Sequence, residues 1–115
     1  MKAIFSKQAI AITANLTIIQ EVLIQYKHIC VWEKGFDSFK ELHVSPDRTS
    51  ITHWDIEHDI EYTFNLMEKS DSVLLELKVI DLLGCINFEI MQRYVDTVLV
   101  RIKEMCHILQ VAVLK

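Results

Sequence analysis

A row of titratable side chains occupies every second position between residues 53 and 61. Its members are His53, Asp55, Glu57, Asp59 and Glu61. Imidazole and carboxylate groups are ligands for divalent metal ions. Neighbours on one face of a β-strand, however, lie about 6.5 Å apart, too far for adjacent ones to share an ion readily. We therefore interpret this row as the solvated outer face of an antiparallel sheet, and we expect no metal site there.

Two cysteine–histidine neighbours could take part in zinc or nucleophile chemistry. They are His28 with Cys30, and Cys106 with His107. Neither pair has the spacing of zinc ligands. On a helix, Cys106 and His107 point about 100° apart, and the sequence places no third group to orient either pair. We expect neither a zinc centre nor a cysteine nucleophile.

Common cofactor and catalytic motifs are absent from the sequence. It contains no dinucleotide-binding glycine pattern, phosphate-binding loop, nucleophile elbow or HExxH motif. Its two glycines are too few for most loops that enclose a phosphate. We therefore expect no cofactor.

Nearly every second residue from 54 to 66 is apolar, and these residues indicate where the opposite face lies. They are Trp54, Ile56, Ile60, Tyr62, Phe64 and Leu66. Alternation of this kind is typical of strands that have one buried face and one wet face. We expect Trp54, Tyr62 and Phe64 to point into the molecule. Residues 49–67 are too long for one typical strand, so we expect a hairpin near residues 57–59, although the alternation continues through it.

The rest of the chain predicts further strands and two amphipathic helices. We expect strands over 2–13, 39–44, 73–79 and 85–91, and a short helix or turn over 28–36. Asn15 is a plausible N-cap for a helix whose apolar positions extend to Tyr26. Residues 94–113 form the clearest helix, with apolar positions at Val95, Val98, Leu99, Ile102, Met105, Cys106, Leu109 and Val113.

The bulk composition is that of one ordinary folded domain covering residues 1–115. Hydrophobic residues make up 51% of the chain, charged residues 24%, and the formal net charge is −4. The negative charge and the lack of Lys/Arg runs disfavour a nucleic-acid or anionic-membrane partner. No membrane span or signal peptide is expected. The three cysteines lie among apolar neighbours, so we expect buried thiols, a reducing compartment and a cytoplasmic protein.

The N-terminal third carries a resemblance to a known superfamily. Residues 12–32 read I-x-A-x(4)-I-x(2)-V-L-x(4)-H-I-x(2)-W, from Ile12 to Trp32. With the order of elements, this resembles the START-like superfamily (helix-grip or Bet v 1-like), which includes polyketide cyclases and lipid-transfer proteins. Two features depart from it, because Asn15 replaces the proline after Ala14 and the proline-rich turn before Trp32 is missing. The resemblance implies an α+β fold in which a curved antiparallel sheet grips a long C-terminal helix, with five or six strands after the first helices.

The resemblance also implies where a ligand would bind, in an apolar cavity between the sheet and the C-terminal helix. Trp32 and Phe36 would lie at its mouth, and His58 and Tyr62 would supply polar groups. Its wall would comprise Trp54, Tyr62, Phe64, Leu77, Phe88, Ile102 and Met105. In so short a chain the same residues could instead fill the interior completely, because protein cores pack densely. Both alternatives remain open at this stage, with a small cavity favoured by the resemblance.

Three functions compete on this basis. The leading one is non-catalytic binding of a small hydrophobic ligand, such as a lipid, an isoprenoid or an aromatic compound. The second is an assembly module with a closed core, for example a homodimer formed through Leu74, Ile80, Leu82 and Leu83. The third is a cyclase- or hydrolase-like enzyme, which would use His58, or Glu33 beside the mouth, as an acid or base. We consider Glu33 more consistent with an exposed surface charge.

Overall fold

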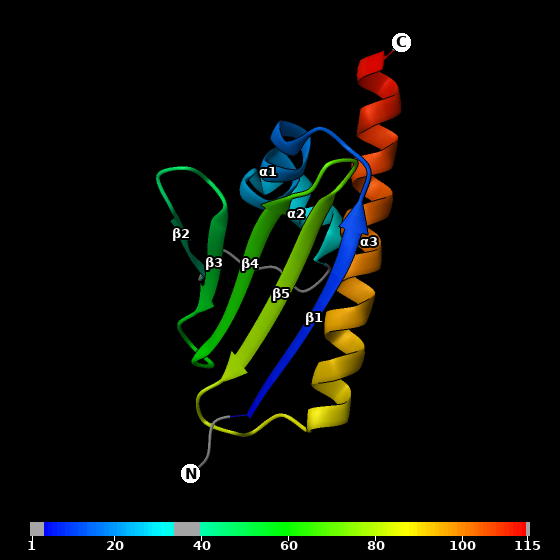
Figure 1. Cartoon of the computed structure of the whole chain (residues 1–115). Helices are drawn as coiled ribbons and strands as arrows, with labels where there is room; N and C mark the ends of the chain where they lie inside the picture. The colour runs from blue at the N-terminus through cyan, green and yellow to red at the C-terminus, as the bar shows by residue number, and fades with distance from the viewer. Residues whose placement is uncertain (1–3, 34–39, 115) are drawn as a thin grey trace.

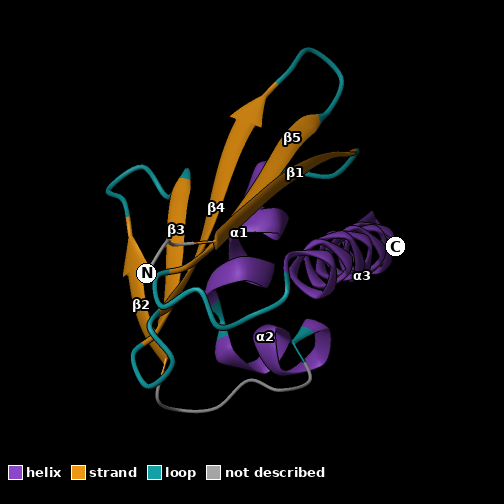
Figure 2. Ribbon diagram, turned by 90° about the horizontal axis from the view of Figure 1, so that it is seen from below, coloured by secondary structure: helices purple, strands orange, loops and turns teal. Residues whose placement is uncertain are grey.

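The computed structural model describes residues 4–33 and 40–114. Along the chain the elements are β1 (Ile4–Ile12), α1 (Leu16–Ile24), α2 (Tyr26–Trp32), β2 (Lys40–Val44), β3 (Ser50–Asp55), β4 (Ile60–Glu68), β5 (Val73–Asp81) and α3 (Phe88–Leu114). All three helices lie on one side of a single curved, open sheet (Figures 1 and 2). The predicted α+β class, with an antiparallel sheet and a long C-terminal helix, is confirmed.

The sheet is antiparallel throughout, with strand order β1-β5-β4-β3-β2. The first and last strands along the chain, β1 and β5, therefore pair with each other. Figure 1 shows α3 running alongside β1 and continuing past its end, whereas β2 forms the opposite edge. Within the described residues four strands follow α2, where we expected five or six.

The missing strand is the one expected over residues 85–91, and that prediction is wrong. Asn87 caps a helix there, because its side-chain oxygen accepts hydrogen bonds from the N–H groups of Glu89 (2.8 Å) and Ile90 (3.3 Å). Helix α3 therefore begins at Phe88, six residues before the start we expected. An asparagine cap satisfies N–H groups that have no partner within the helix. The same chemistry confirms Asn15 as the cap of α1, where its side chain accepts from Thr17 N–H at 2.9 Å.

The hairpin between β3 and β4 reverses the phase that we expected for β3. Asp55 pairs with Ile60, so these two residues lie opposite each other and face the same side. The four residues between them make the inward positions odd-numbered in β3 and even-numbered in β4. His53 and Asp55 are consequently buried. Trp54 lies on the outer face beside Glu61, so its predicted inward orientation is wrong.

The concave face of the sheet and the helices enclose one hydrophobic core. Strands β3, β4 and β5 contribute alternate side chains, and α3 contributes a stripe that faces them. The largest fully buried members are Phe64, Ile12, Ile19, Leu23, Ile51, Leu75, Leu77, Ile102, Val22, Val79, Val95 and Val98. Residues from every described element except β2 belong to this core. Burial of this stripe explains why α3 packs along β1 and β5 on the concave side of the sheet.

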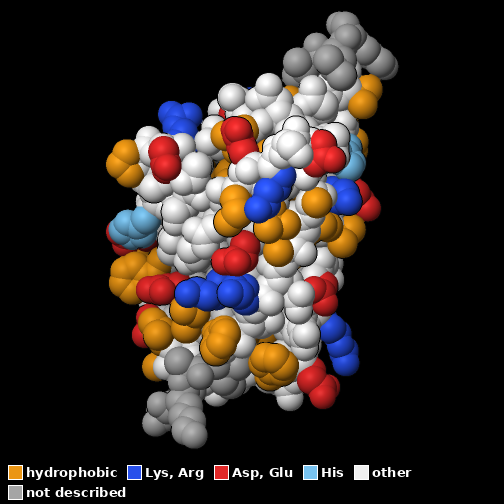
Figure 3. Space-filling view, viewed as in Figure 1, with side chains coloured by type: hydrophobic (Ala, Val, Ile, Leu, Met, Phe, Trp, Pro, Cys, Tyr) orange, Lys and Arg blue, Asp and Glu red, His pale blue; other side chains and the backbone are white. Residues whose placement is uncertain are grey.

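The outer face of the sheet mixes charged and apolar side chains (Figure 3). One cross-strand row on this face consists of Phe5, Ile80, Glu61 and Trp54. Leu74 and Ile80 are half-buried there, as their phase in β5 predicts, and Leu82 and Leu83 are exposed in the turn after β5. Glu76 and Lys78 separate Leu74 from Ile80 along β5, and Lys7 of the neighbouring β1 pairs with Lys78.

Candidate ligand-binding site

The junction of α1 and α2 fixes the two side chains at the centre of the site. The last carbonyl groups of a helix have no partner within it. In α1 the Val22 carbonyl accepts a hydrogen bond from the Trp32 indole N–H (2.8 Å), and the Leu23 carbonyl lies 2.9 Å from His53 Nε2. Because a carbonyl only accepts, His53 carries its proton on Nε2 in this contact. Trp32 and His53 therefore tie α2 and β3 to the end of α1.

Three rings form a compact cluster at this junction. The centroids of Trp32 and Phe64 lie 5.5 Å apart, those of Trp32 and His53 5.8 Å, and those of His53 and Phe64 5.5 Å. All three pairs are edge-to-face, an arrangement that aromatic quadrupoles favour. The cluster packs α2 against the concave face of β3 and β4.

A small internal space lies between this cluster and α3. It measures about 10 Å³ and is lined by Trp32, Glu33, His53, Tyr62, Phe64, Leu77, Tyr94 and Val98. Tyr62 and Tyr94 meet edge-to-face across it, with their centroids 5.8 Å apart. A space of this size holds about one water molecule. The interior is therefore closed to anything larger in this conformation, in line with the densely packed alternative.

Four of the predicted site residues lie around this space. Trp32, Tyr62, Phe64 and Leu77 line it, while Ile102 is buried in the adjoining core. Met105 is half-buried and lies outside the space. Phe88 is half-exposed in the first turn of α3, away from the space. Phe36 lies outside the described residues.

His58 occupies the hairpin between β3 and β4, so its predicted inward orientation is wrong. Its ring is largely exposed, and Nδ1 lies 3.0 Å from a carboxylate oxygen of Asp55. Asp55 also accepts a hydrogen bond from the His58 backbone N–H (3.1 Å). The neighbouring Trp54 indole donates to Asp59 at 3.3 Å. These contacts stabilise the turn, which needs a left-handed backbone at Asp59 (φ 54°).

Three residues of the internal space are not expected there from the sequence pattern. The pattern predicts His53 on the outer face and Glu33 as an exposed charge, and it does not single out Tyr94. Glu33 is in fact buried. A signal for His53 existed, because the expected hairpin near residues 57–59 permits either phase in β3. No sequence signal indicated that Glu33, the residue directly after α2, would be buried.

A larger apolar groove lies on the surface between α2 and α3. Its volume is about 390 Å³, and it is lined by Val31, Trp32, Arg101, Glu104, Met105, Ile108 and Leu109. Five of these seven residues are apolar, and two of them, Trp32 and Met105, belong to the predicted site. Trp32 lines both the groove and the internal space. The Ile108 side chain is 69% exposed and forms the outer rim.

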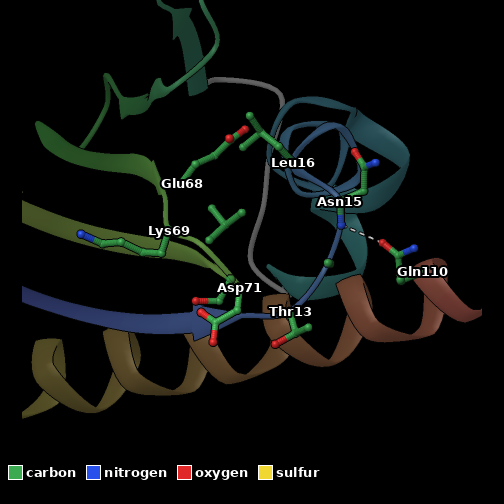
Figure 4. Close-up of a pocket in the computed structure, with 10 residues that line it drawn as sticks. Thr13, Asn15, Leu16, Glu68, Lys69, Asp71 and Gln110 are labelled. Atoms are coloured by element: carbon green, nitrogen blue, oxygen red, sulfur yellow. Dashed lines mark hydrogen bonds between the residues drawn. The ribbon is translucent and has the colours of Figure 1, made fainter.

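A third hollow, of about 450 Å³, lies where the β1–α1 connection meets the β4–β5 turn (Figure 4). Its lining includes the charged residues Glu68, Lys69 and Asp71. Gln110 of α3 accepts a hydrogen bond there from the Asn15 backbone N–H (2.7 Å). Charges of both signs around an open hollow indicate no preferred ligand class. The groove between α2 and α3, with its apolar lining, is the better candidate for a hydrophobic ligand.

The three cysteines differ in exposure, which corrects the expectation that all are buried. Cys30 and Cys85 are exposed, while Cys106 is buried in the core. Burial raises the pKa of the Cys106 thiol to about 12, from an ordinary value of 9.0. A hydrogen bond with Cys30 raises the pKa of Tyr26 above its ordinary value.

We predict that iodoacetamide at about pH 8 alkylates two thiols per folded chain and the third only after unfolding. Intact-mass spectrometry over time would count the adducts, and rapid labelling of all three thiols would contradict the buried position of Cys106.

The raised pKa of Cys106 also makes the stability of the fold depend on pH. Ionisation of Cys106 favours the unfolded chain, so its contribution to stability is complete below about pH 9 and declines as the pH rises towards about 12.

The described residues contain no group of three or more His, Cys, Asp or Glu side chains arranged to hold a metal ion. Among the helices of residues 4–33 and 40–114, none has both the length and the apolar character needed to cross a bilayer. Comparison with known proteins gave no matching family model and no matching curated protein.

Proposed function

We propose that this chain is a non-catalytic binding domain that holds a small hydrophobic ligand, such as a lipid, an isoprenoid or an aromatic compound, in the groove between α2 and α3. The observation that carries the proposal is the groove itself, an apolar recess of about 390 Å³. Small-molecule sites usually measure about 300–1,000 Å³ and have mostly apolar linings with a few polar groups. Arg101 and Glu104 are the polar groups of this groove.

The closed interior argues for the groove rather than the internal space as the binding position. A space for about one water would have to expand many times to admit a lipid or an aromatic compound. Such an expansion would separate Trp32 from Phe64 and His53, whose ring contacts it would break. The groove needs no such change, because its volume is already open to solvent.

The expected affinity is modest. A ligand that buries about 300 Å² of apolar surface gains about 7.5 kcal/mol from the hydrophobic effect. Loss of translational and rotational freedom offsets part of this gain. We therefore expect dissociation constants of about 1 µM or weaker.

Tryptophan fluorescence offers a direct test, because the chain has two tryptophans and only Trp32 lines the groove. In a Trp54→Phe background, titration with decanoate or 1-anilinonaphthalene-8-sulfonate should change Trp32 emission saturably. Adding Ile108→Glu should weaken binding by about tenfold, which corresponds to about 1.4 kcal/mol, because a charged side chain replaces an apolar one that lines the groove.

Val100→Glu is the matched control, since Val100 is an exposed apolar residue of the same helix outside the groove. It should leave the affinity unchanged. Absence of saturable binding to both probes, or an equal loss in the two variants, would contradict binding in the groove.

A further inference from the structure

The β2 strand presents an open hydrogen-bonding edge. It pairs with β3 on one side, and on its other side no strand of residues 4–33 and 40–114 pairs with it. Figure 1 shows β2 at the opposite edge from β1, which lies beside α3. An open edge is a template for strand addition, and proteins commonly restrict it with short strands or charges. Here the edge carries apolar side chains that remain exposed, at Leu42 (40%) and Val44 (38%).

The β2–β3 turn determines which backbone groups face outward. Ser45 N–H donates to the Ser50 carbonyl (2.9 Å), so this is a hydrogen-bonded pair of the ladder. Antiparallel pairs alternate, which turns the backbone groups of Glu41 and His43 towards β3. The N–H and C=O groups of Leu42 and Val44 therefore point away from the sheet.

The turn also holds this edge in a defined geometry. The Asp47 carboxylate accepts hydrogen bonds from the hydroxyl groups of Ser45 and Thr49, both at 2.8 Å. The Ser45 hydroxyl oxygen in turn accepts from the Ser50 N–H at 3.0 Å. β2 is thus presented as an extended strand by a hydrogen-bonded turn.

We propose that two copies of this chain associate by antiparallel pairing of their β2 strands around Leu42, which joins two five-stranded sheets into one. The sequence of β2, Lys-Glu-Leu-His-Val, is complementary to itself in this register. Leu42 lies opposite Leu42 of the partner subunit on the concave face. On the outer face, Glu41 lies opposite His43 of the partner subunit, and His43 opposite the partner subunit's Glu41.

The placement of a carboxylate opposite an imidazole on both sides of the two-fold axis identifies a second copy as the occupant of this edge. Within one chain His43 Nε2 and a Glu41 carboxylate oxygen already lie 3.0 Å apart, so the two groups form a compatible pair on one face. A two-fold axis through Leu42 duplicates that pair across the interface, as in isologous dimers. The backbone groups of Leu42 and Val44 then gain partners, which is the main source of affinity in strand addition. Five paired positions make a small interface, so the dimer should be weak.

Sedimentation velocity at chain concentrations between about 5 µM and about 500 µM covers the dissociation constants that we expect for so small an interface. The chain should shift from a monomer of 13.5 kDa towards twice that mass as concentration rises. Leu42→Pro should abolish the shift, because proline removes the central outward N–H without removing a bond to β3. Phe5→Ser, on the outer face of β1, should leave the shift intact. A strict monomer at all concentrations, or a dimer lost with Phe5→Ser but kept with Leu42→Pro, would overturn the proposal.

Cross-linking tests the register independently of any effect of proline on folding. In a background with Cys30→Ser and Cys85→Ser, Leu42→Cys should form an oxidised dimer, since opposite Cα atoms lie about 5.5 Å apart in such pairs. Val44→Cys is the matched control, because in this register the two copies of position 44 are about 13 Å apart along the strands. We expect at least about fivefold more cross-linked dimer for Leu42→Cys. Equal yields, or a higher yield for Val44→Cys, would overturn the two-fold register.

Discussion

Replacing Trp32 by alanine should lower the free energy of unfolding by about 4 kcal/mol. The side chain is 3% exposed and packs edge-to-face on both Phe64 and His53. Its indole N–H also satisfies the Val22 carbonyl at the end of α1. The substitution removes all of these contacts and leaves a cavity beneath α2. Since domains of this kind are stable by about 5–15 kcal/mol, a marginal or unfolded variant is the expected result in urea denaturation followed by circular dichroism.

Trp32→Phe separates the contribution of ring packing from that of the hydrogen bond to the Val22 carbonyl. Phenylalanine retains an aromatic ring near Phe64 but cannot donate to Val22, so we expect a smaller loss of about 1–2 kcal/mol. If Trp32→Ala cost less than Trp32→Phe, or if neither variant changed the urea midpoint, Trp32 would not connect α1, α2 and the sheet as described.

Replacing Asp81 by alanine should destabilise the fold by about 3 kcal/mol. Asp81 ends β5, is 1% exposed, and accepts hydrogen bonds from three backbone N–H groups of the following loop. The donors are Leu83 (3.1 Å), Gly84 (3.2 Å) and Ile86 (2.7 Å). Alanine leaves all three without this acceptor, and the loop that leads into α3 loses its anchor. Thermal or urea unfolding would measure the loss.

Asp71→Ala is the matched control for Asp81→Ala. Asp71 is an exposed aspartate in the turn between β4 and β5. Its substitution should change stability by no more than about 0.5 kcal/mol. Similar losses in the two variants would show that the Asp81 contacts do not hold the β5–α3 loop.

The order of elements was predictable because it depends on local periodicity and capping. Alternation in β4 and β5, the stripe on α3 and the Asn15 cap are all present within short windows of sequence. The start of α3 was missed because the alternation over residues 85–91 outweighed a single capping residue, Asn87. An asparagine followed by Glu89 in the first turn is a helix-start signal that could have corrected it.

The faces of β3 were less predictable than its existence. An apolar tryptophan at position 54 and charged neighbours suggested an inward Trp54, but the length of one turn decides the phase of the strand. His53 tolerates burial because its ring meets the Leu23 carbonyl, a contact 30 residues apart in sequence. Long-range hydrogen bonds of this kind cannot be read from periodicity.

The candidate site was only partly predictable for a related reason. The sequence indicates which side chains face inward, such as Phe64 and Leu77, but it does not give the volume that remains after they pack. The groove depends on the angle at which α2 meets α3. The direction in which α2 leaves α1 is set at Gln25, whose extended backbone (φ −81°, ψ 127°) ends one helix and starts the next.

Methyl chemical shifts report residue by residue whether a ligand binds between α2 and α3. In a titration with decanoate followed by ¹H–¹³C spectra, we expect saturable shifts of the Val31, Met105, Ile108 and Leu109 methyl groups. The signals of Leu74 and Ile80, on the outer face of the sheet, should stay unchanged. Shifts confined to that outer face, or no saturable shift anywhere, would show that the groove does not bind the ligand.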